Sequence, residues 1–142
     1  MRKILCIMTI LIQLALSAGA QEWIVPENRK SRLSPFVFTD DTRKAGETSY
    51  NANCLSCHGN PGKGNVINLV PPPPDPVSDK VQKNSDGEMY YKVAEGRLQM
   101  PAFKNVLTSN EIWNLVAYIR SFNKSYKQSV MPLITSSAYP GA

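Results

Sequence analysis

The residues best suited to chemistry stand together in the segment Cys54-Leu55-Ser56-Cys57-His58, which includes the only histidine of the chain. Residues three apart on a helix share a face, so these two thiols can each add to one of the two vinyl groups on a single haem edge. The imidazole of the next residue is then carried over the porphyrin plane, within reach of the iron. This C-x-x-C-H pattern predicts one covalently bound haem c, attached through Cys54 and Cys57, with His58 as an iron ligand.

Three other interpretations of the motif are weaker. A redox-active C-x-x-C is typical of a βαβ unit, whereas the sequence around this motif predicts helix and loop. A structural zinc site needs four ligands, and the thiols and imidazole here lie within five consecutive residues. A structural disulfide would leave His58 unexplained. The motif therefore favours haem over each alternative.

The second axial ligand must be something other than histidine, since the chain offers no second one. Met89, Met100 and Met131 are the methionines downstream of residue 20. Met89 falls in the first turn of an expected helix, and Met131 lies near the end of the chain. Met100 follows a helix stop at Gly96 and precedes Pro101, which holds the residue before it extended. We therefore expect Met100 to bind the iron and to favour the ferrous state; the alternative is that it fills the core.

A helix over about residues 42–57 is expected to carry the motif. Gly46, Tyr50 and Cys54 are four residues apart and share one helical face. Helix-breaking residues follow the motif and open a loop. They are Gly59, Pro61, Gly62 and Gly64.

Two further helices are expected over 85–95 and 108–122, with one short turn over 79–82. Each longer helix opens with a capping box, in which a hydroxyl and a Glu three residues later bond each other's backbone N–H groups. The boxes are Ser85 with Glu88 and Thr108 with Glu111. No segment alternates as a strand would, so the sequence predicts an all-α fold.

The N-terminal residues 1–20 have the features of a secretory signal peptide. Residues 1–3 are basic, residues 4–16 are mostly apolar, and Ala18 and Ala20 form an A-x-A cleavage pattern. The apolar run is shorter than the roughly 20 residues that a membrane-spanning helix needs. We therefore predict cleavage after Ala20 and a periplasmic location; the alternative is an uncleaved membrane anchor.

The remaining chain divides into three expected parts: an extended arm over 21–41, a haem domain over 42–123, and a flexible, Ser- and Pro-containing tail over 124–142. The formal net charge of +5 falls by two when Arg2 and Lys3 leave with the signal peptide. No dense run of Lys and Arg is present, so a nucleic-acid partner is not expected.

From about Trp23 to Phe122 the chain resembles a class I cytochrome c. Three segments carry the resemblance: Gly46…Tyr50…Cys54-Leu55-Ser56-Cys57-His58-Gly59, Gly96-Arg97-Leu98-Gln99-Met100-Pro101-Ala102-Phe103, and Glu111-Ile112-Trp113-Asn114-Leu115-Val116-Ala117-Tyr118-Ile119-Arg120. In that family the first and last helices cross where a glycine permits close approach and an aromatic residue packs onto it. Gly46 and Tyr118 occupy those places, with Tyr50 and Leu115 beside them. The resemblance implies the small class I cytochrome c fold, with crossed N- and C-terminal helices around one covalently bound haem.

The resemblance also implies groups that orient the iron-bound histidine and groups that pair with the haem propionates. A metal-bound histidine donates its other ring N–H to a fixed acceptor, and in the family a carbonyl of a proline-containing loop accepts it. Four prolines, Pro71 to Pro74, compete for this role, and Pro71 or Pro72 is expected. Arg97 and Lys104 are candidates to pair with the haem propionates, with a solvated surface charge as the equal alternative.

Several functions are compatible with such a domain. The main expectation is an exported monohaem carrier that moves single electrons between redox partner proteins. The alternative is a tethered or subunit haem domain of a larger membrane or periplasmic oxidoreductase complex, for which the arm and the tail would be docking segments. An enzyme or sensor with an open iron site is disfavoured by a retained Met ligand. A disulfide protein without haem is the remaining class.

Overall fold

The computed structural model describes residues 22–64 and 67–129, and the structural statements below concern these residues alone. The predicted signal peptide and Met131 lie outside them, and the division of the chain into signal, arm, domain and tail stays a prediction. The helices in chain order are α2 Glu27–Lys30, α3 Asp40–Asn53, α4 Leu55–His58, α5 Asp79–Gln82, α6 Asp86–Glu95 and α7 Ser109–Arg120. No β-strand occurs in the described ranges, and the all-α prediction is confirmed. Among the same residues, no helix combines the length and apolar character needed to span a bilayer.

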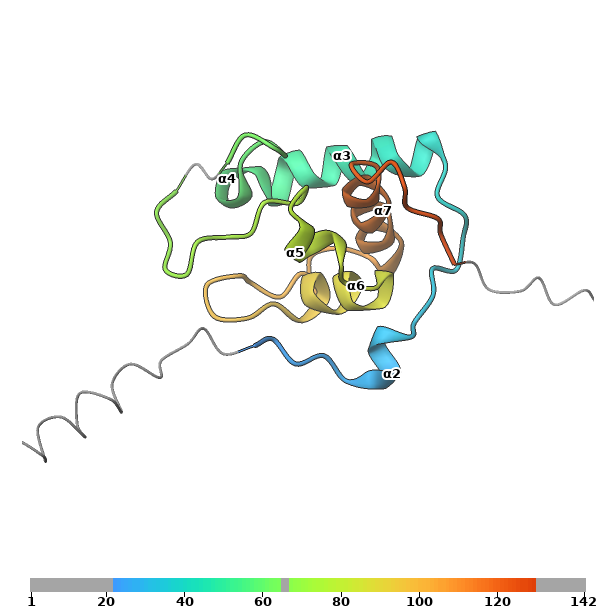
Figure 1. Cartoon of the computed structure of the whole chain (residues 1–142), viewed down its shortest axis with the longest axis horizontal. Helices are drawn as coiled ribbons and strands as arrows, with labels where there is room; N and C mark the ends of the chain where they lie inside the picture. Colours follow the sequence, from blue (N-terminus) through green and yellow to red (C-terminus); the bar gives the residue numbers. More distant parts are fainter. Residues whose placement is uncertain (1–21, 65–66, 130–142) are drawn as a thin grey trace, which may run out of the picture.

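Helices α3 and α7 cross, and their contact is the most extensive between any two helices described (Figure 1). The crossing is close because Gly46 has no side chain: a Cβ there would lie 1.9 Å from the carbonyl oxygen of Asn114 and 2.8 Å from the Cβ of Tyr118. The Tyr50 and Tyr118 rings pack at the crossing, with centroids 5.4 Å apart. The crossing expected from the family resemblance is therefore present.

The single helix expected over 42–57 is in fact two helices, and that prediction was wrong in detail. α3 begins earlier, at Asp40, because Thr39 caps it and exchanges reciprocal bonds with Thr42. The chain then departs from helical geometry at Cys54, with φ −119° and ψ −33°, and restarts as the single turn α4. By contrast, the capping boxes at Ser85 and Thr108 open α6 and α7 as predicted.

Buried apolar side chains form two separate groups on either side of α7. The first, which we call the site cluster, comprises Tyr50, Val93, Ala94, Phe103, Ile112 and Leu115. The second, which we call the arm cluster, comprises Met89, Trp113 and Val116, with Phe36 and Phe38 of the arm packed against it. The two clusters are separate because the apolar stripe of α7 is wide: Ile112 and Leu115 lie in the site cluster, and Trp113 and Val116 lie in the arm cluster.

The N-terminal arm is not merely extended, because it contains the short helix α2 and packs on α6 (Figure 1). A Cβ on Gly87 would lie 2.2 Å from the carbonyl oxygen of Arg29, so only glycine fits where the arm crosses the first turn of α6. The Ser85 hydroxyl also donates to the carbonyl of Lys30 at 2.6 Å. The arm therefore covers the start of α6.

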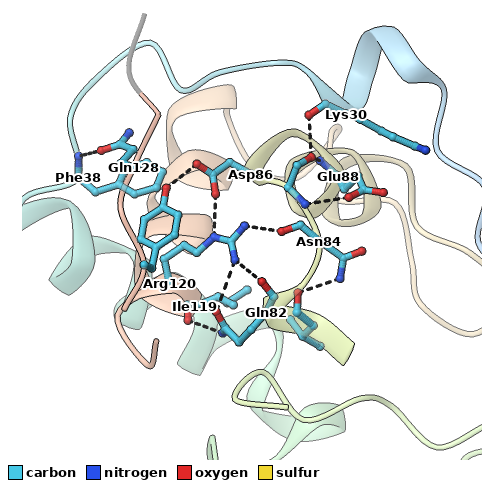
Figure 2. A network of polar contacts seen from close by, with 12 residues as sticks. Lys30, Phe38, Gln82, Asn84, Asp86, Glu88, Ile119, Arg120 and Gln128 are labelled. Carbon is cyan, nitrogen blue, oxygen red and sulfur yellow. Dashed lines mark hydrogen bonds and ion pairs between the residues drawn. The ribbon is translucent and has the colours of Figure 1, made fainter. Parts of the chain in front are cut away.

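A buried polar network joins α5, α6, α7 and the tail on the side of the arm cluster (Figure 2). Arg120 Nε donates to Asp86 at 2.7 Å, and its two other nitrogens donate to the backbone carbonyls of Gln82 and Asn84. The Tyr126 hydroxyl donates to the second oxygen of Asp86, at 2.5 Å. The Gln128 side chain bonds the arm at the backbone of residues 36 and 38. Within 124–129, expected to be part of a flexible tail, Tyr126 and Gln128 are thus bonded to the domain.

Candidate haem-binding site

The C-x-x-C-H motif occupies one helical turn immediately after the α3–α7 crossing. The Cys54 carbonyl accepts from the N–H groups of Cys57 at 3.1 Å and His58 at 2.9 Å, which closes that turn. Both cysteines are free thiols and each is half-buried. The turn therefore presents two free thiols and one imidazole as a single unit, as attachment to one haem edge requires.

The environment of the Cys54 thiol argues against a disulfide-exchange site. Burial, with a smaller effect from the neighbouring Cys57, raises the pKa of the Cys54 thiol to about 11. Cysteines that exchange disulfides have lowered pKa values, because the thiolate is the nucleophile. Cys54 thus lacks the property that a redox-active C-x-x-C depends on.

His58 is oriented by a backbone carbonyl, but not by the one that the sequence suggested. Its Nδ1 lies 2.9 Å from the carbonyl oxygen of Pro74. A carbonyl can only accept, so Nδ1 is the donor, and in the neutral imidazole the lone pair that can bind a metal is then on Nε2. The expectation of Pro71 or Pro72 was wrong. Asp75 explains why, since its carboxylate accepts from the N–H groups of Gly62 and Val77, both at 3.0 Å, and so fixes the loop at its last proline.

Tyr50 is a site residue that the sequence did not single out as more than a packing aromatic. Its hydroxyl donates to the Gly59 carbonyl at 2.8 Å, directly after His58. Burial is the main cause that raises the pKa of this hydroxyl above its ordinary value, so it stays protonated and able to donate. The only sequence signal was its position, one helical turn before Cys54.

Met100 lies in a tight turn that follows α6. The turn is closed by reciprocal backbone bonds between Arg97 and Met100, at 2.8 and 3.0 Å. Gly96 has φ +63°, and a Cβ there would lie within 2.5 Å of the backbone of Met100 and Pro101. Backbone bonds from residues 103 and 104 to α6, at 3.2 and 3.1 Å, hold the loop beyond the turn. Met100 is therefore placed by a stiff loop, as its Pro and Gly neighbours predict.

The structure separates the methionines that the sequence offered. Met100 packs against the site cluster, as Cys54 and Leu55 do. Met89 is buried in the arm cluster, beside Trp113. An apolar cluster with the Cys54 thiol and the Met100 thioether packed against it fits a porphyrin with its iron, and Met89 belongs to a different part of the core.

The two candidate propionate partners have other contacts. Lys104 pairs with Glu95 at 2.5 Å, and both side chains are substantially exposed. The guanidinium of Arg97 lies 5.8 Å from the centre of the Trp23 ring. For Lys104 the alternative of a solvated surface charge fits the structure better.

Comparison with known proteins decides the family. Residues 41–119 match the family model described as cytochrome c oxidase, cbb3-type, subunit III. The chain belongs to this family and is a class I cytochrome c. As such it holds one covalently bound haem c and carries electrons.

The relatives of this cytochrome include small cytochromes c6. The chain is 31% identical over 74 residues to cytochrome c6 of Parathermosynechococcus lividus, an alignment that covers 52% of this chain and 83% of the relative. It is 30% identical over 87 residues to cytochrome c6 of Thermosynechococcus vestitus, covering 61% of this chain and 75% of the relative. Among solved structures, a reducing HAO-like protein complex of Kuenenia stuttgartiensis includes a chain that aligns with a TM-score of 0.52 and 25% identity, covering 76% of this cytochrome and 53% of that chain.

Proposed function

We propose that this cytochrome is an exported one-electron carrier whose haem is attached through Cys54 and Cys57 and whose iron is bound by His58 and Met100. The observation that supports the assignment most directly is the bond from His58 Nδ1 to the Pro74 carbonyl. It holds the ring by Nδ1, so the nitrogen that remains to bind a metal is Nε2.

Cys54 and Cys57 would attach the haem without any oxidant, because each addition would break an S–H bond, join the sulfur to one vinyl carbon and pass the hydrogen to the other. Cys54 and Cys57 lie on one turn of backbone, so their spacing selects a single haem edge. This arrangement fixes His58, the next residue, relative to the same edge.

The bound haem supplies a one-electron change between ferric and ferrous iron. His58 and Met100 would both bind the iron and would so close it to a substrate. The Met100 sulfur favours the ferrous state and so raises the reduction potential. The held imidazole and the stiff Met100 loop both limit rearrangement of the ligands when the electron arrives or leaves.

The assignment is tested by changing the proposed ligands in the holoprotein. Wild-type protein matured with covalent haem should resist acid–acetone extraction of that haem, and Cys54→Ala with Cys57→Ala should abolish the link. Met100→Ala should remove the weak red absorption band of iron–thioether ligation and open the iron to carbon monoxide. Met89→Ala is the matched control and should keep the band. Extractable haem in the wild type would refute attachment through Cys54 and Cys57. An absorption band that survives Met100→Ala would refute Met100 as the iron ligand.

Export is proposed from residues 1–20 alone. Intact-mass measurement of protein isolated from its native source should give a chain that begins at Gln21. A chain that begins at Met1 in the membrane fraction would instead support the uncleaved anchor.

A second candidate function is that of a haem subunit in a larger oxidoreductase complex. Two observations favour it: the family model is described by a cytochrome c oxidase subunit, and the Kuenenia structure is a protein complex. Size-exclusion chromatography of detergent-solubilised native membranes distinguishes the two. Haem absorbance that elutes with a large complex supports the subunit, and elution as a free small protein supports the mobile carrier.

A further inference from the structure

One residue contacts the backbone on both sides of the C-x-x-C-H turn. The Tyr50 carbonyl accepts from the Cys54 N–H at 2.8 Å, and the Tyr50 hydroxyl donates to the Gly59 carbonyl at 2.8 Å. Tyr50 is itself held rigidly, because it is only 2% exposed and its ring packs on Tyr118 at the helix crossing. The most extensive helix contact described, between α3 and α7, is thus connected through Tyr50 to both ends of the turn that carries His58.

The turn needs such a connection because it cannot hold its own shape. α4 has four residues, far fewer than a helix needs to be stable alone. It begins at a break in α3 and ends at Gly59, where φ is +71° and the chain changes direction. Of the side chains described, only Tyr50 bonds to the Gly59 carbonyl. Without that bond, the backbone after His58 would depend on helical bonds to Cys54 and Leu55 alone.

We propose that Tyr50 is a positioning residue for the iron ligand His58, acting through its hydroxyl bond to the Gly59 carbonyl. Two contacts then fix the imidazole: Tyr50 holds the backbone beside it, and Pro74 holds its Nδ1. This inference rests on the proposed ligation of iron by His58.

Loss of the hydroxyl has a defined electronic consequence. If the backbone at Gly59 moves, the bond from Nδ1 to Pro74 lengthens and the imidazole becomes a poorer electron donor. A poorer donor stabilises ferric iron less, so the reduction potential should rise. A hydroxyl that only contributed to packing would lower stability and leave the potential unchanged.

The test compares two tyrosine-to-phenylalanine variants of the holoprotein. Tyr50→Phe removes the bond to Gly59 and keeps the ring. Tyr90→Phe is the matched control, because the Tyr90 hydroxyl bonds Ser109 Oγ at 3.0 Å, away from the motif. Tyr50→Phe should raise the reduction potential above that of both the wild type and Tyr90→Phe. It should also speed hydrogen exchange at the His58 and Gly59 amides about fivefold, while exchange in α6 stays unchanged.

The proposal is overturned if Tyr50→Phe and Tyr90→Phe have equal reduction potentials, or if hydrogen exchange rises evenly across α3, α6 and α7. Either result would show that the Tyr50 hydroxyl has a purely structural role. A measurement on the wild type guards against a variant that takes up no haem. The Tyr50 hydroxyl proton should give a slowly exchanging resonance with a nuclear Overhauser contact to Gly59, and its absence also overturns the proposal. A wild-type protein with haem not bound by His58 would refute the proposed function instead, so the two failures are distinguishable.

Discussion

The two sides of α7 are held together in different ways. On the arm side, the guanidinium of Arg120 donates to the side chains of Asp86 and Gln82 and to two backbone carbonyls, and Asp86 bonds both Arg120 and Tyr126 (Figure 2). On the site side, the His58 ring is held by one hydrogen bond, and the backbone beside His58 and Met100 turns with positive φ at Gly59, Gly96 and Leu98. The buried charges of the arm side are paired within the protein, whereas the site side is a set of groups positioned to surround a porphyrin. We infer that the arm side is the frame and that the site side needs its cofactor.

The largest expected effect comes from removing the haem. The porphyrin contributes much of the apolar surface of a small domain, so the site cluster should lose its packing without it. Unattached protein carrying Cys54→Ala and Cys57→Ala should show weak helical circular dichroism and no cooperative unfolding transition. Cooperative unfolding of this apoprotein would mean that the frame alone specifies the fold.

A substitution in the arm-side frame should lower the free energy of unfolding without changing the reduction potential of the haem. Arg120→Met leaves the buried carboxylate of Asp86 without its cation, which should lower the free energy of unfolding by about 3–5 kcal/mol. The measurement is guanidinium denaturation of the oxidised holoprotein. The control is Glu27→Gln, which removes an exposed pair with Lys30 and should change stability by less than about 1 kcal/mol. A shifted reduction potential in Arg120→Met would contradict the division between frame and site.

The helix crossing joins the two sides, and overpacking it should affect both. In an exposed helix Gly→Ala is stabilising by about 1 kcal/mol. At Gly46 the added Cβ would collide with the Asn114 carbonyl, so Gly46→Ala should instead destabilise by about 1–3 kcal/mol. Ala45→Gly, at the exposed neighbouring position, is the control and should cost only about 1 kcal/mol. A neutral Gly46→Ala would mean that α3 and α7 can separate at little cost.

The features that the sequence predicted are those with local signals. Capping boxes marked the starts of α6 and α7, and the resemblance to class I cytochromes located the Gly46 crossing. The electron-carrier function and the haem c follow from the same motif and are confirmed by the family match. The four proposed haem residues stay a prediction, although the structure brings Cys54 and Met100 to one apolar cluster.

What could not be predicted depends on contacts between distant residues. The choice of Pro74 over Pro71 or Pro72 depends on how Asp75 bonds Gly62, and four identical prolines give no signal of that. The helix break at Cys54 lies in a segment with continuous helical spacing. The binding of residues 126 and 128 to the frame needs a buried carboxylate and an arm backbone that local patterns do not reveal.

The smallest expected effect concerns the backbone strain beside Met100. Leu98 is the one non-glycine residue in the described ranges with positive φ, at +54°, and its side chain is 80% exposed. A branched residue in the left-handed region costs about 1–3 kcal/mol, and exposure means that little packing offsets this. Glycine adopts the conformation freely but loses about 0.5–1 kcal/mol of unfolded-state entropy. Leu98→Gly should therefore raise the free energy of unfolding of the holoprotein by about 1 kcal/mol and leave the potential unchanged, because the turn keeps its closing bonds. Gln99→Gly, at the next exposed position, has no such strain to relieve and should lose about 0.5–1 kcal/mol. If both variants lose stability equally, Leu98 is not strained, and the site side is less dependent on special backbone geometry than the comparison with the frame implies.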